Sequence, residues 1–265
     1  MIAPRGTIYY GLRPANDCGL RVAGPHFVIV VSDDALNAIA STRVVAWLTH
    51  LDVRLPPFHS HLCFTDPTPG QPDQKVSALA FWNLVELPTS MFAPPVLELG
   101  RSCDCGLARF TALWDRVVLG SDINRYLQSY IDRQEVESTE STLASGLDQG
   151  DIIEIQIGAR RQVEVVLSCK EFHRNLAARA RGNPLDSVVS MNLAPLDDKT
   201  AFERPELIVW AGPRSETGQV ESYAIDSPPR RTFLRPATAF RRLDTLDPST
   251  TDRVRRVASA SLGMG

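Results

Sequence analysis

The sequence predicts a mainly β, α+β protein made of two small, mostly antiparallel barrel-like domains in tandem, each with helices appended. Short β-branched apolar runs alternate with Gly- and Pro-rich turns, which is typical of antiparallel strands. The same succession of strands, closed by an amphipathic helix that ends in Leu-Gly, begins at Gly6 and again at Gly150. A length of 265 residues with 43% hydrophobic content is sufficient for two cores.

The clearest strands of the first copy are PHFVIVVS (25–32) and VVAWLT (44–49), two apolar runs of the kind that forms buried strands. Each run has a polar residue at one end, His26 in the first and Thr49 in the second. If the two strands are neighbours, their ends would build one small polar site on a rigid sheet.

The rest of the first copy combines further strands with helices. Apolar residues of 107–118 recur at helical spacing and stop at Gly120, and residues 123–131 repeat this pattern. Residues 132–149 are polar, acidic and rich in Ser and Thr, as linkers are. We therefore expect a first domain at 1–131, a linker at 132–149 and a second domain at 150–265. Further strands are expected at 6–12, 59–64 and 76–83.

The second copy shows the same kinds of segment. Asp247 and Pro248 have the residue types of a helix cap and a first helical position. The buried face of that last helix is expected at Val254, Val257, Ala258 and Leu262, with Gly263 as the stop. Strands are expected at 150–157, 162–168, 187–191, 207–211 and 220–225, and a helix at 172–180.

The two copies can be aligned segment by segment. Gly6-Thr-Ile matches Gly150-Asp-Ile, and the run ending in Ser32 matches the run ending in Ser168. The remaining matches pair 44–47 with 188–191 and 76–83 with 220–227.

These motifs resemble the MazF/PemK/Kid toxin family, most clearly in FRRLDTLDPSTTDRVRRVASASLG (240–263). The resemblance covers roughly 1–120 and 150–263. It implies SH3-like barrels, a fold shared with the gyrase poison CcdB, and metal-independent cleavage of single-stranded RNA. It also implies an acidic antitoxin partner and dimers that bind RNA across their interface, so that two copies in one chain would form a covalent pseudo-dimer.

The resemblance also implies where catalytic residues lie: an Arg before the second strand, the Thr of a Leu-Thr pair and sometimes an Asp on a later strand. In the first copy these positions hold His26, Thr49 and Trp82, the last beside Asn83. In the second copy they hold Gln162 (after Arg161), Ala194 and Asp226. Neither copy is complete, so either the copies share a composite site or the site has decayed. The candidate catalytic residues are His26, Thr49, Arg161 and Asp226.

RNA cleavage without a metal needs a base for the 2′-OH, an acid for the leaving oxygen and a donor for the phosphorane charge. The ordinary pKa of histidine suits His26 to acid–base work. The alternative for His26 is a strand-end histidine bonded to the backbone, and for Thr49 and Asp226 it is strand-end hydrogen bonding. Candidate RNA contacts are Arg230, Arg231, Arg235, Trp82 and Asn83, with core packing as the alternative for the tryptophan.

Charge supports two hypotheses. The net charge is −3, with 11 basic and 16 acidic residues in 1–149 against 17 and 15 in 150–265. The basic second half and Thr49 favour an endoribonuclease. The acidic first half and the missing family Arg favour a catalytically degenerate module of the same fold that binds nucleic acid or a protein partner.

Neither a cofactor nor a metal is predicted. His50, His59 and His61 lie on different local structures without Cys or carboxylate at ligand spacing, and the five cysteines include one close pair, Cys103 and Cys105. A reducing cytoplasm suits unpaired cysteines. The sequence has no 18-residue apolar run and no signal-peptide pattern at its start, so we expect a cytoplasmic protein without membrane segments.

Overall fold

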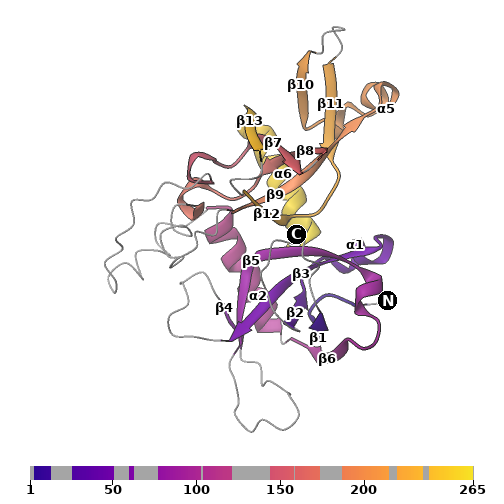
Figure 1. Ribbon diagram of the computed structural model, residues 1–265, viewed down its shortest axis with the longest axis vertical. Helices are drawn as coiled ribbons and strands as arrows, with labels where there is room; N and C mark the ends of the chain where they lie inside the picture. The colour runs from indigo at the N-terminus through magenta and orange to yellow at the C-terminus, as the bar shows by residue number, and fades with distance from the viewer. Residues whose placement is uncertain are drawn as a thin grey trace, which may run out of the picture.

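The computed structural model describes residues 3–12, 26–50, 60–62, 77–102, 104–120, 144–157, 159–173, 187–214, 220–234 and 239–264. Its two halves, 3–120 and 144–264, each contain one antiparallel sheet with helices appended, which confirms the predicted fold class (Figure 1). The described strands of the first sheet lie in the order β4-β5-β3-β2-β1-β6. They are β1 (Thr7–Leu12), β2 (His26–Val30), β3 (Thr42–His50), β4 (Ser60–Leu62), β5 (Ser77–Pro88) and β6 (Leu97–Arg101).

The second sheet repeats this order strand for strand, as β10-β11-β9-β8-β7-β13. The long β5 of the first half corresponds to two shorter strands here, because β12 pairs with β9 beyond the end of β11. The strands are β7 (Asp151–Ile157), β8 (Arg160–Val166), β9 (Ser187–Leu196), β10 (Trp210–Arg214), β11 (Val220–Ile225), β12 (Arg230–Phe233) and β13 (Ala239–Thr245).

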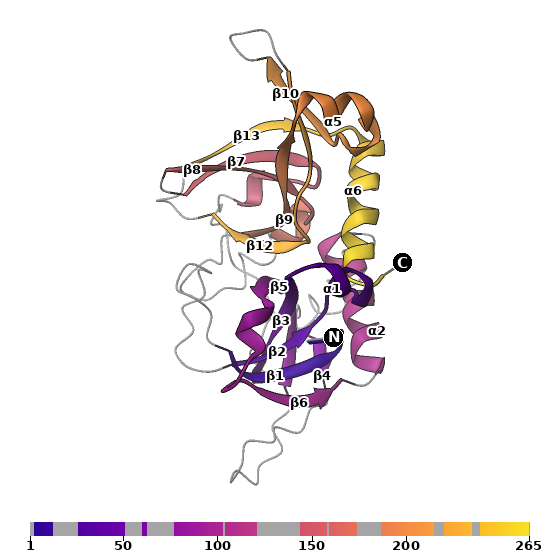
Figure 2. The ribbon, with the colours of Figure 1, turned by 90° about the vertical axis from the view of Figure 1, so that its right-hand side faces the viewer.

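The helices lie mainly on one side of the sheets, where α6 runs alongside both halves (Figure 2). The carboxylate of Asp247 caps α6 by accepting hydrogen bonds from the backbone N–H groups of Ser249 and Thr250, as its position before Pro248 predicts. Helical segments are α1 (Asp34–Ile39), α2 (Asp104–Leu113) with a π-helical continuation (Trp114–Val118), α5 (Asp198–Glu203), α6 (Pro248–Ser261) and 3₁₀ turns at Thr89–Phe92, Ala144–Gly146 and Pro205–Leu207.

Several sequence expectations need correction. β6, β12, β13 and α5 are additional elements, and the strand expected at 207–211 begins only at Trp210 because Pro205–Leu207 forms a 3₁₀ turn. Val257 is 42% exposed rather than buried, since α6 packs through Val254, Ala258 and Leu262. The expected helix at 123–131 lies outside the described residues.

The repeat extends to individual backbone hydrogen bonds. Gly6 N donates to Val30 O at 2.8 Å, and Gly150 N donates to Val166 O at 2.9 Å. Both glycines have positive φ, 82° and 87°, a region that side chains disfavour. Val30 therefore corresponds to Val166.

The next pair of equivalent bonds sets the register of the third strand. Ser32 N donates to Val44 O, and Ser168 N donates to Val189 O, both at 3.3 Å. Val44 thus corresponds to Val189, one residue further along than the sequence alignment placed it.

The terminal helix of each half ends against the other half. The end of α6 in the second half receives a hydrogen bond from the first half, from Asp33 N to Ser261 O at 2.9 Å. The end of the α2 continuation in the first half receives one from the second half, from Cys169 N to Val118 O at 3.0 Å. Because Ser32 corresponds to Ser168, Asp33 and Cys169 occupy equivalent positions, so these two contacts are related by the repeat.

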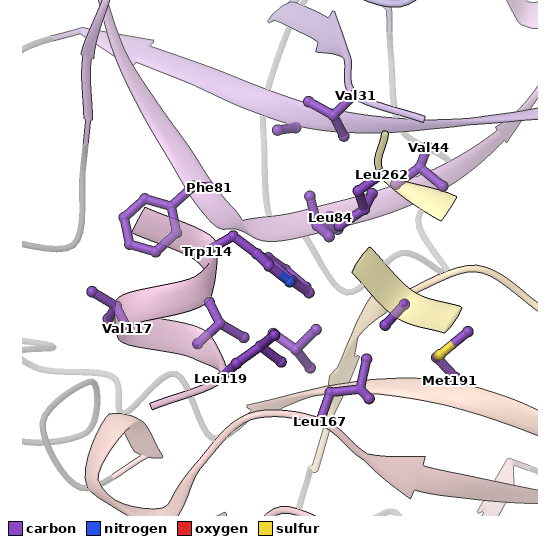
Figure 3. Packing of buried hydrophobic residues seen from close by; sticks show 14 of the residues in the cluster. Val31, Val44, Phe81, Leu84, Trp114, Val117, Leu119, Leu167, Met191 and Leu262 are labelled. Atoms are coloured by element: carbon purple, nitrogen blue, oxygen red, sulfur yellow. The ribbon is translucent and has the colours of Figure 1, made fainter. Parts of the chain in front are cut away.

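One hydrophobic core lies between the two sheets. Trp114 and Val117 of the first half pack in the same cluster as Leu167 and Met191 of the second half, and Leu262 of α6 lies beside Val44 (Figure 3). A smaller cluster covers the opposite face of each sheet; in the second half it includes Ala144 and Leu147, from the segment expected to be a linker. The two halves are therefore joined by shared apolar burial, the dominant stabilising term in folding.

Candidate nucleic-acid interface

β2 and β3 are antiparallel neighbours, as expected, and they place His26 and Thr49 at one end of their ladder. Phe27 pairs with Leu48, so the next residues outward in register are His26 and Thr49. The backbone thus brings these two candidates to facing positions in adjacent strands. The side chains of His26 and Thr49 lie outside the described residues.

In the second half, the buried carboxylate of Glu164 is surrounded by Ser190, Arg230 and Thr232, and we call these four residues the Glu164 cluster. Glu164 is 1% exposed. Its Oε1 accepts a hydrogen bond from Arg230 Nη2 at 2.7 Å, and its Oε2 accepts one from Ser190 Oγ at 2.6 Å. Ser190 Oγ also lies 2.8 Å from Thr232 Oγ1. In the alternating sequence RQVEVV, Glu164 has the pattern of an exposed strand residue, which explains why its burial was not foreseen.

The Glu164 cluster lies on the outer face of the second sheet, the face turned away from the shared core. Val163 and Val165 of β8 pack on the shared core, so Glu164 between them points to the other face. Ser190 precedes Met191, which belongs to the shared core, and Arg230 is paired with Ser190. Arg230, a predicted RNA contact, therefore has a partly exposed side chain, 27% accessible, that is held by a buried carboxylate.

Asp226 belongs to the same outer face. Its Oδ2 accepts a hydrogen bond from Asn192 Nδ2 at 3.1 Å, and its backbone N–H donates to Asn192 O at 2.9 Å. Asn192 is the register partner of Glu164. Asp226 thus presents an exposed carboxylate at the end of β11, beside the Glu164 cluster.

Arg161 lies on the opposite face. Arg161 lies two residues before Val163 in β8, so its side chain points to the same face as that of Val163, which packs on the shared core. Its Nη1 lies 3.9 Å from Glu154 Oε2. The same carboxylate is held by Arg241 Nε at 3.1 Å. Because the side chain of Arg161 is 72% exposed, this ion pair is screened by solvent and weak. Arg161 and Asp226 therefore cannot reach one phosphate from the same side of the sheet.

Arg231 is buried at the junction of the two halves. Its Nε donates to Ser187 Oγ at 2.9 Å, and its Nη1 donates to Asn83 Oδ1 of β5 at 3.1 Å. Burial lowers the pKa of the Arg231 guanidinium to about 9. Both Arg231 and Asn83 are thus parts of the inter-half contact rather than an open surface. The side chain of Trp82 and the whole of Arg235 lie outside the described residues.

Two general features of the described segments bear on function. Within them, no three His, Cys, Asp or Glu side chains gather in a way that would hold a metal ion. His59 lies outside the described residues, as do the side chains of His50 and His61. Every helix in the described ranges is too short or too polar to cross a lipid bilayer.

Comparisons with known proteins include a weak structural likeness. No protein-family model and no curated protein matches the chain. A solved structure described as an endoribonuclease in complex with its cognate antitoxin, from Mycobacterial species, aligns with 50% of this chain and 97% of that one. The identity is 16% and the TM-score 0.28, so we base no conclusion on this likeness.

Proposed function

We propose that this chain is a toxin-like endoribonuclease of a type II toxin–antitoxin system, which cleaves single-stranded RNA in the cytoplasm without a metal or cofactor. The observation that carries the proposal is that one chain contains two sheets of identical strand order and that the terminal helix of each half ends against the other half. It supports the sequence resemblance to the MazF/PemK/Kid family, whose members are normally homodimers. In this proposal residues 1–131 and 150–265 are the two toxin-like domains, joined by 132–149, and an acidic antitoxin is the protein partner.

The first half supplies the reacting pair in this proposal. His26 takes the proton of the 2′-OH, whose oxygen attacks the adjacent phosphorus, and the bond to the 5′-oxygen breaks as that oxygen takes a proton from water. Thr49, at the facing position of β3, donates a hydrogen bond to the phosphorane. The products are a 2′,3′-cyclic phosphate and a 5′-hydroxyl. Arg161 and Asp226 are the second-half candidates, and since they lie on opposite faces, only one of them serves any one phosphate.

The test is cleavage of a long single-stranded RNA by purified protein in EDTA. We expect 5′-hydroxyl products from the wild type and at least a hundredfold slower cleavage by His26→Ala and Thr49→Ala, the range of a lost acid–base group. Gln162→Ala is the matched control, because Gln162 occupies the position of His26 in the second half. Cleavage that survives both substitutions, or that requires a metal, would remove this proposal.

A catalytically degenerate binding module is the second candidate, and one observation favours it. Four described arginines of the second sheet are paired with carboxylates of the same half: Arg161 and Arg241 with Glu154, Arg230 with Glu164, and Arg242 with Asp151. Such pairing lowers the positive charge available to RNA. RNA or protein binding without any cleavage by the wild type would favour this candidate.

A further inference from the structure

The repeat allows the Glu164 cluster to be compared with its counterpart in the first half. Val30 corresponds to Val166, so Glu164 corresponds to Val28. Ser190 pairs with Val166 and Arg230, just as Val45 pairs with Val30 and Val85. Two residues further along, Thr232 corresponds to Leu87. The first half therefore fills these four positions with Val28, Val45, Val85 and Leu87, all of which pack in an apolar cluster.

The fold itself does not require charge at these positions, since the first half builds the same sheet with aliphatic side chains. Moving a carboxylate out of water costs free energy that an ion pair rarely recovers in full. Replacing a buried ion pair by apolar residues of similar volume is often neutral or stabilising. The ion pair of the second half, between Glu164 and Arg230, thus needs an explanation other than stability.

The buried carboxylate of Glu164 holds one end of the Arg230 guanidinium. Glu164 is itself held from a second side by Ser190, so its carboxylate has little freedom to turn. It takes one guanidinium nitrogen of Arg230, Nη2. In the described part of the chain this is the one interaction of that guanidinium, which leaves Nε and Nη1 as further donors on a partly exposed group. A fixed planar fork of this kind is suited to a phosphate group.

We propose that Arg230, positioned by the buried Glu164, is a phosphate-binding residue for single-stranded RNA, and that the outer face of the second half alone provides it. Asp226 lies on the same face through its bond to Asn192, so the bound phosphate would lie near an exposed carboxylate. The inference rests on the proposed function for its ligand. It makes the pseudo-dimer functionally asymmetric, since the first half has a valine in place of each charged residue.

The experiment measures binding of a fluorescent single-stranded 2′-O-methyl RNA of about 20 nucleotides, which lacks the attacking hydroxyl and cannot be cleaved by that route. Arg230→Met should lower the affinity about tenfold or more and reduce the slope of log affinity against log salt by about 0.7, the value for one lost contact to a single strand. Arg230→Lys should keep the slope but lose affinity, because lysine lacks the fork. Arg204→Ala is the matched charge control, since Arg204 is an exposed arginine paired with Glu206 elsewhere in the half.

Glu164→Gln gives the sharpest test because the two explanations predict opposite signs. Glu164→Gln removes a negative charge near the bound RNA, a polyanion. If Glu164 acts only through its charge, or only stabilises the fold, this substitution should raise the affinity for RNA. If Glu164 positions Arg230, the affinity should fall, and Glu164→Asp should recover part of it. A rise in affinity with Glu164→Gln would overturn the proposal.

A variant with four substitutions tests whether the loss of binding comes from misfolding. Glu164→Val, Ser190→Val, Arg230→Val and Thr232→Leu together install the first-half residues, and we expect a folded protein that has lost the same binding as Arg230→Met. Retained RNA affinity in this variant would overturn the proposal. A wild-type protein that does not bind the RNA, or that binds an acidic polyglutamate peptide instead of RNA, would overturn it as well. Binding that depends on Arg230 without cleavage of ordinary RNA would instead remove only the proposed enzyme activity. Cleavage unaffected by Arg230→Met would remove only this inference.

Discussion

The Nε1–H of Trp210 donates a hydrogen bond to Asp244 Oδ2 at 2.9 Å, and this bond joins the two opposite edges of the second sheet. β10 and β13 are the first and last strands of that sheet, so the contact requires the sheet to curl upon itself. Trp210 also packs against Tyr223, with ring centroids 5.1 Å apart. This side-chain bond turns an open sheet into a barrel-like one.

The closure bond should be measurable as a coupling energy. Trp210→Phe removes the donor and Asp244→Ala removes the acceptor, and we expect a coupling of about 1 kcal/mol between them in urea unfolding. The same cycle with Asp252→Ala, an exposed acid on α6, is the control and should give a coupling near zero. Equal coupling in the two cycles would mean that the edges are not joined by this bond.

The stability of the protein should fall in mild acid because of His173. This buried imidazole contacts Ser168 Oγ through Nε2 at 2.5 Å and Leu147 O through Nδ1 at 3.1 Å. Since a carbonyl only accepts, Nδ1 carries the proton and Nε2 accepts from the serine. Burial lowers the pKa of His173 to about 4, despite the opposing hydrogen bond to Leu147 and the charge of Asp148.

The sign follows from linkage. The unfolded chain binds the proton at its ordinary pKa of about 6.5, so the stabilising contribution is present above that pH and is lost as the pH falls toward 4. We expect a loss on the order of 3 kcal/mol across this window. His173→Asn installs the residue of the first half, where Asn37 bonds to Ser32, and should flatten the pH dependence. An unchanged pH profile in that variant would refute the assignment.

The two halves should be coupled through Asn83 and Arg231. Asn83→Ala leaves the Arg231 guanidinium without one of its buried acceptors, and we expect a loss of about 2 kcal/mol in the free energy of unfolding. Arg231→Met removes the buried charge and keeps much of the volume, so it should be tolerated better than Asn83→Ala. The reverse order of stabilities in urea titrations would contradict this account.

The glycines that follow the terminal helices of the two halves should resist substitution. Gly120 and Gly263 have φ of +76° and +66°, where a side chain costs about 1–2 kcal/mol. A Cβ at Gly120 would lie 2.9 Å from Cys169 Sγ, and one at Gly263 would lie 2.8 Å from Arg5 Nε, each in the other half. We expect Gly120→Ala and Gly263→Ala to lower thermal stability by more than the backbone cost alone. Gly146→Ala, with no atom near its Cβ, is the control and should be close to neutral.

The sequence by itself determined the elements whose signals are local. Apolar runs fixed β2 and β3, helical spacing with Asp247 and a terminal glycine fixed α6, and the recurrence of those signals predicted the two-copy fold. A local pattern carries this information because strand alternation, capping and positive φ each depend on a few neighbouring residues.

Only the tertiary structure decided how the candidate site residues are placed. Glu164 has the pattern of a solvent-facing strand residue, yet it is buried because Arg230 and Ser190 come to it from two other strands. Arg231, expected at an RNA surface, is buried because it meets Asn83 of the other half. Arg161 and Asp226 are separated by the sheet itself. These outcomes depend on contacts between residues far apart in the chain, which residue types and spacing do not specify.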